Sequence, residues 1–91
     1  MDYPETNEVE AVLKAIAVQT GDVSGRPVRV DLLPVLGSSG PFYTVVLLSE
    51  NRARMCDKLS FLLNRRFSLG TRSFLLKPQE VVKLISTPLP S

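Results

Sequence analysis

Seven consecutive residues decide the fold, and they read Phe42-Tyr43-Thr44-Val45-Val46-Leu47-Leu48. The stretch is mostly apolar, rich in β-branched and aromatic side chains, and lacks the alternating polar residues of a half-exposed strand. Such a run is typical of a strand in the middle of a sheet with both of its faces covered. The sequence therefore predicts a sheet built around residues 42–48.

Two elements are expected before this strand. Apolar residues at helical intervals predict an amphipathic helix over 7–20, and apolar–polar alternation predicts a strand over 28–33. The Gly- and Ser-rich segment 37–41 then predicts a loop. A loop that cradles a phosphate usually leads into a helix, whereas this one leads into a strand, so we interpret it as a plain connection.

A second helix is expected after the central strand. Ser49 is a good N-cap residue and Gly70 a good stop. Arg65 and Arg66 fall in the last turns, where positive charge suits the helix dipole. The expected buried stripe of this helix consists of Met55, Cys56, Leu59, Leu62, Leu63 and Phe67.

Two short strands are expected to close the chain, over 73–76 and 81–85, with a β-turn at 77–80 between them. The predicted order is therefore α-β-β-α-β-β. The predicted fold class is α/β (α+β), a small mixed sheet with two packed helices.

The chain has 91 residues, which leaves room for one domain. We expect it to span residues 1–91, with loose ends at 1–5 and 87–91. No apolar run approaches the length of a membrane span, and the acidic N-terminus does not resemble a signal or transit peptide. The expected location is the cytoplasm, or an organelle matrix if a transit peptide has been removed.

The residue inventory argues against catalysis. There is no histidine, which removes the commonest general base and metal ligand, and Cys56 is the single cysteine. Asp31, Glu50, Asp57 and Glu80 are scattered, with no spacing that forces two carboxylates together. We therefore expect no enzyme, no catalytic residue, no metal and no cofactor, and interpret Cys56 as a buried structural thiol.

Basic residues gather in the second helix, and the net charge is +2 with a pI of about 9.0. Arg54, Lys58 and Arg65 have the spacing that places them on one helix face. Such a row fits either a contact surface for phosphate or an acidic partner, or a solvated face. The aromatic residues that would interleave on a platform for single-stranded RNA are missing from the pattern.

An aromatic pair, an apolar run and a short polar step follow one another without a gap between Phe42 and Arg52. Together with the preceding helix and strand and the later segment Ser73 to Lys83, this order resembles the Iojap-like ribosomal silencing factors over residues 8–85. The chain departs from the family pattern at Pro41, at Leu47-Leu48 and in the turn at 77–79.

The resemblance implies a nucleotidyltransferase-like fold without catalytic carboxylates. It also implies a factor that docks on a large-subunit ribosomal protein at the intersubunit face, which blocks subunit joining or assists large-subunit assembly. Contact with ribosomal RNA stays open, and no membrane is involved. With the basic row included, the expected partner-binding residues are Phe42, Tyr43, Asn51, Arg52, Arg54, Lys58, Phe74 and Lys77.

The alternative is a small protein-interaction module unrelated to ribosomes. A β-grasp-like domain or a viral accessory protein would fit the same pattern of elements. The position of residues 42–48 in the sheet discriminates between these hypotheses, because an edge position would count against the family resemblance.

Overall fold

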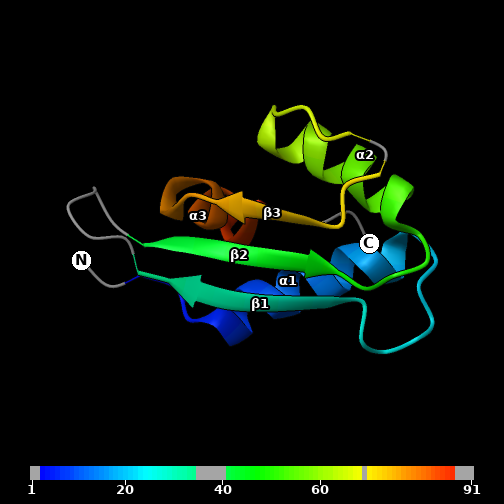
Figure 1. Cartoon of the computed structure of the whole chain (residues 1–91), viewed down its shortest axis with the longest axis horizontal. Helices are drawn as coiled ribbons and strands as arrows, with labels where there is room; N and C mark the ends of the chain where they lie inside the picture. Colours follow the sequence, from blue (N-terminus) through cyan, green and yellow to red (C-terminus); the bar gives the residue numbers. More distant parts are fainter. Residues whose placement is uncertain (1–2, 35–40, 69, 88–91) are drawn as a thin grey trace.

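Three antiparallel strands form the sheet of this computed structural model, in the spatial order β1-β2-β3 (Figure 1). The strands are β1 (Val28–Leu33), β2 (Phe42–Leu47) and β3 (Ser73–Leu76). The structure describes residues 3–34, 41–68 and 70–87. The loop expected at 37–41 falls almost entirely outside the described residues, as do the outermost residues of the two expected loose ends.

Three helices accompany the sheet: α1 (Thr6–Gln19), α2 (Arg52–Leu63) and α3 (Pro78–Ser86). Most side chains on one face of the sheet are buried, except the exposed Leu32 and the half-buried Phe74, while those on the other face are exposed or half-buried. In Figure 1, α1 and α3 lie behind the sheet and α2 lies beyond β3. The fold is therefore α+β, with its core between the helices and one face of the sheet.

The central position of β2 confirms the prediction for residues 42–48, but the expectation that both of its faces are covered is wrong. Tyr43, Val45 and Leu47 are buried, whereas Phe42 and its alternating neighbours are half-buried. The sheet is also antiparallel throughout rather than mixed.

The last element is a helix, so the predicted order α-β-β-α-β-β is wrong at its end. Pro78 stands in the first turn of α3, where its missing N–H costs nothing, and the Glu80 carboxylate accepts the N–H of Lys77 at 3.0 Å. Val81 and Leu84 are buried three residues apart, which is a helical interval. The segment expected as a β-turn is therefore the start of α3.

Helix α2 is shorter than expected because it begins after Ser49 and ends before Arg65. Its C-cap, Asn64, adopts the left-handed conformation with φ 50°, which an Asn tolerates better than most residues. Arg65, Arg66 and Phe67 therefore lie beyond the helix rather than in its last turns.

The core joins the sheet to all three helices. Tyr43 is fully buried, and its hydroxyl donates to the carbonyl of Pro4 just before α1 at 2.5 Å. Among the described residues, no helix combines the length and the apolar character needed to cross a membrane. The remaining buried apolar residues are Val9, Leu13, Ile16, Ala17, Val28, Val30, Val45, Leu47, Met55, Cys56, Leu59, Leu63, Leu76, Val81 and Leu84.

Two neighbouring substitutions test the helical assignment of the last segment. Leu84 is 2% exposed and Ile85 is 40% exposed. Leu84→Ala is therefore expected to lower the free energy of unfolding by about 2–5 kcal/mol, and Ile85→Ala by roughly 1 kcal/mol or less. Urea unfolding followed by circular dichroism measures both. A strand over 81–85 would place Ile85 on the same face as Val81, so a larger loss for Ile85→Ala would contradict the helix.

Candidate binding surface at the edge of strand β3

The outer side of β3 presents backbone groups that no described strand pairs. The amide of Leu47 donates to the carbonyl of Arg72, so the backbone groups of alternate residues, including Phe74, point toward β2. Those of Ser73 and Leu75 therefore point away from the sheet. Nη1 of Arg65 donates to the carbonyl of Leu75 at 2.7 Å, which covers one of these outward groups.

The Arg65 side chain contacts three segments at this edge. Its Nη1 lies 3.2 Å from both carboxylate oxygens of Glu80 in α3, in addition to its bond with β3. Its guanidinium carbon also lies 4.9 Å from the centre of the Phe67 ring, within the range of a cation–π contact. The end of α2, strand β3 and the start of α3 are thus held at one point.

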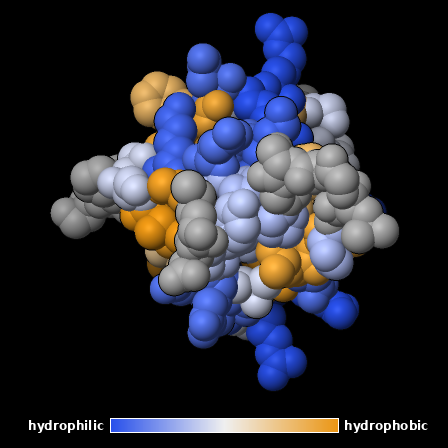
Figure 2. Space-filling view, turned by 90° about the vertical axis from the view of Figure 1, so that its left-hand side faces the viewer, coloured by the Kyte–Doolittle hydropathy of each residue, from blue (hydrophilic) through white to orange (hydrophobic). Residues whose placement is uncertain are grey.

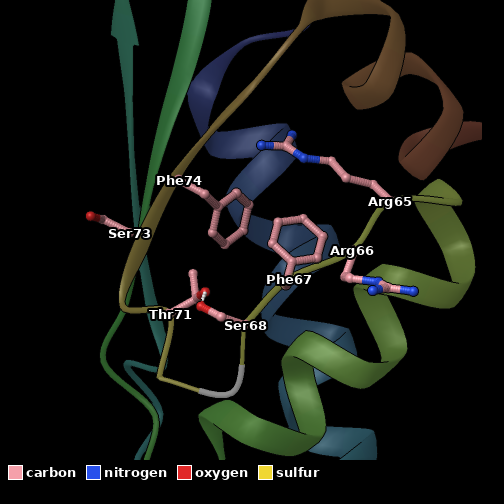
Figure 3. Close-up of a pocket in the computed structure, with 7 residues that line it drawn as sticks. All are labelled: Arg65, Arg66, Phe67, Ser68, Thr71, Ser73 and Phe74. Atoms are coloured by element: carbon pink, nitrogen blue, oxygen red, sulfur yellow. Dashed lines mark hydrogen bonds between the residues drawn. The ribbon is translucent and has the colours of Figure 1, made fainter.

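A shallow hollow of about 600 Å³ lies between the loop after α2 and β3. The rings of Phe67 and Phe74 meet edge to face at its centre, 4.8 Å apart, and the hydroxyls of Ser68 and Thr71 bond at 2.8 Å on one side (Figure 3). In Figure 3 the Arg66 side chain points away from the two rings. The hollow is therefore aromatic inside, with charge and hydroxyls at its rim.

A second hollow, of about 500 Å³, lies on the other side of Arg65. It is lined by Phe42, Arg65, Leu75, Lys77 and Glu80. We call the two hollows together the β3 edge surface. Figure 2 looks at the end of the molecule where β2 begins and β3 ends, and it shows apolar patches set among hydrophilic side chains. The surface combines apolar area with both signs of charge.

The structure brings together only some of the residues expected to bind a partner. Phe42 and Lys77 line one hollow of the β3 edge surface, and Phe74 lines the other. Tyr43 lies in the core with no exposed surface, because its side chain points to the helix side of the sheet.

The other expected residues lie on α2. Asn51 is its N-cap and Arg52 its first residue, with Nε of Arg52 buried and without a hydrogen-bond partner among the described residues. Arg54 and Lys58 line a separate hollow on the outer face of α2. Arg65 does not continue their row, because it lies past the helix and is held by Leu75 and Glu80.

The start of α2 is fixed by a small polar cluster. Oγ of Ser49 accepts the N–H of Asn51 at 3.1 Å. Hydrogen bonds from the hydroxyl of Ser49 and from Ser24 lower the pKa of Asp22 below its ordinary value of 3.8. Gly21 has a φ of 99°, and a β-carbon there would lie 3.4 Å from Nδ2 of Asn51, so this loop and the helix start lie close together.

Cys56 and Asp31 do not line the β3 edge surface. Cys56 is buried in the core, where burial raises the pKa of its thiol and so disfavours the thiolate. Asp31 lies 3.3 Å from Nε of Arg29 on the exposed face of the sheet. The described residues include no group of three or more acidic, cysteine or histidine side chains that could hold a metal ion.

Neither a protein-family model, nor a curated protein, nor a solved structure matches the chain.

The sequence pattern did not identify Arg65, Phe67, Leu75 or Glu80 as neighbours. The first two fall at helical spacing in the sequence, and this spacing predicts that they belong to the second helix. The signal that places them elsewhere is Asn64, a residue that commonly ends a helix in the left-handed conformation.

Ser49→Ala tests the polar cluster at the start of α2. Ser49 is 1% exposed, and the change removes both a donor to Asp22 and an acceptor for Asn51. We expect the free energy of unfolding to fall by about 1 kcal/mol at neutral pH, because the N–H of Asn51 loses its hydrogen-bond acceptor. NMR titration should show the Asp22 pKa rising toward 3.8.

The sign of the pH dependence follows from this lowered pKa. The Asp22 carboxylate contributes its full stability above the unfolded value of 3.8, and the contribution is lost as the pH falls through the lower folded value. The stability difference between the wild type and Ser49→Ala should therefore shrink in strong acid. A difference that grows on acidification, or an unchanged Asp22 pKa, would contradict this role for Ser49. Ser86→Ala, at an exposed serine, is the control.

Proposed function

We propose that the chain is a ribosome-binding factor that docks on a protein of the large subunit through the β3 edge surface. Docking there would block subunit joining or assist large-subunit assembly. One observation carries the proposal: Phe42, Phe74 and Lys77, three residues to which the resemblance assigns the partner contact, line adjacent hollows along one edge of the sheet.

The chemistry of the surface favours a protein partner. Aromatic and arginine side chains are enriched at the cores of protein interfaces, and this surface contains Phe67, Phe74 and Arg65. Leu75 adds an aliphatic side chain that is 43% exposed. Arg66 and Lys77 stand where a neighbouring phosphate of ribosomal RNA would add an electrostatic contact. No catalysis is assigned to the surface, and no cofactor.

The binding role and the class of partner in this proposal come from the family resemblance. The proposal does not include the nucleotidyltransferase-like sheet that the resemblance implies, because α3 occupies the segment where that sheet would have its last strand. This same departure favours the alternative function, a small protein-interaction module unrelated to ribosomes. In that case the β3 edge surface has the same role for a different protein.

Co-sedimentation with separated large and small ribosomal subunits at physiological salt tests the proposal. The wild type is expected to bind the large subunit saturably and the small subunit not at all. Leu75→Asp is expected to weaken binding at least about tenfold, because a charge would be buried against the partner. Its thermal stability should stay close to that of the wild type, since Leu75 is partly exposed in the free chain.

Val23→Asp is the matched control. It introduces the same charge at a residue that is 98% exposed in the loop between α1 and β1, and it should bind like the wild type. No binding, or weak binding to both subunits that vanishes with salt, would contradict the ribosomal proposal and leave the interaction module. Large-subunit binding that Leu75→Asp leaves unchanged would contradict the assignment of the surface.

A further inference from the structure

The outer face of α2 presents an aromatic side chain that the β3 edge surface does not use. Phe61 is 83% exposed, which makes it the most exposed aromatic residue among those the structure describes. The opposite face of the helix packs into the core through Met55, Cys56, Leu59 and Leu63. Phe61 therefore contributes nothing to the core and leaves a large apolar side chain in water.

Phe61 stands beside a hollow of about 380 Å³ between the end of α1 and α2. The hollow is lined by Thr20, Arg54, Asp57, Lys58 and Phe61. We call these residues the α2 outer surface. It differs from the β3 edge surface in position and in composition, because the two share no lining residue.

The cations of this surface form no ion pair with another described residue, so they are available to a ligand. No ion pair between described residues involves Arg54 or Lys58, whereas Lys14, Arg29 and Arg65 each have an acidic partner. Lys58 lies three residues before Phe61 and Arg54 seven before it, so all three project from the same side of the helix. An exposed aromatic ring flanked by two unpaired cations complements a ligand that presents an apolar group beside negative charge.

The small number of cations favours a protein segment over a nucleic acid. Arg54 and Lys58 are the two cations that line the hollow, with Asp57 beside them. The basic row is also short, because Arg65 is held by Glu80 and Leu75 and does not extend it. Affinity for nucleic acid depends on several simultaneous phosphate contacts, which two cations next to a carboxylate do not provide.

We propose that the α2 outer surface binds an acidic amphipathic segment of a protein partner. Phe61 packs against an apolar side chain of that segment. Arg54 and Lys58 pair with its carboxylates. This binding site is separate from the proposed ribosomal docking through β3.

A displayed library of random 12-residue peptides is the probe. Peptides are selected on the wild-type chain and depleted on Phe61→Ser, which should fold normally because Phe61 is exposed. The expected result is enrichment of sequences that combine a large apolar residue with Asp or Glu. An enriched peptide, synthesised and measured by fluorescence anisotropy, should lose at least about tenfold in affinity with Phe61→Ser and again with Lys58→Glu.

Leu75→Asp separates this proposal from the ribosomal one, because it alters only the β3 edge surface and should bind the peptide like the wild type. Three results would overturn the proposal: no enrichment, enriched peptides without acidic residues, or Phe61-dependent binding of a 20-nucleotide RNA that is tighter than that of any peptide. Phe61-dependent self-association in analytical ultracentrifugation would also overturn it, by identifying a second copy of the chain as the occupant.

Discussion

The helix-facing side of β2 is the constraint on which the rest of the structure depends. Tyr43, Val45 and Leu47 are completely or almost completely buried there, and β2 is the described strand that has a neighbour on both sides. These apolar side chains are removed from water only where other side chains pack on them, and residues of α1, α2 and α3 do this from one side of the sheet. The hydroxyl of Tyr43 then fixes the entry to α1 through Pro4.

This one-sided packing leaves the β3 edge accessible. The helices leave the second face of the sheet open and place β3 at its edge, next to the end of α2. An edge strand with unpaired backbone groups invites unwanted pairing, and natural proteins usually protect such edges. Arg65 gives this protection at Leu75, and its pairing with Glu80 leaves a hollow on either side. The feature that shields the edge also shapes the β3 edge surface.

The sequence was most informative where a pattern has one structural solution. The mostly apolar run at 42–48 predicted a central strand, and the alternation over 28–33 predicted another strand. The run 81–85 contains residues that suit a strand as well as a helix, and tertiary packing of Val81 and Leu84 decided in favour of the helix. Side-chain spacing does not reveal the end of α2, because helical spacing of apolar residues continues past Asn64. The backbone leaves the helix there in the left-handed conformation.

The candidate surface was less predictable than the fold, because it depends on which strands are neighbours. Phe42 and Lys77 are far apart in sequence and meet only through the pairing of β2 with β3. The role of Arg65 depends on the carbonyl of Leu75 pointing outward, which in turn depends on the strand register. The resemblance implied a partner contact for Phe42, Phe74 and Lys77, but it did not show that they share one edge.

Hydrogen exchange at β3 tests the central claim most directly. The amides of Ser73 and Leu75 point away from β2, so they should exchange faster in the free chain than those of Phe74 and Leu76. If the β3 edge surface docks on the large ribosomal subunit, binding should slow exchange at Ser73 and Leu75 and leave the loop around Val23 unchanged. Bound protein whose β3 amides exchange as they do in the free chain would contradict the account.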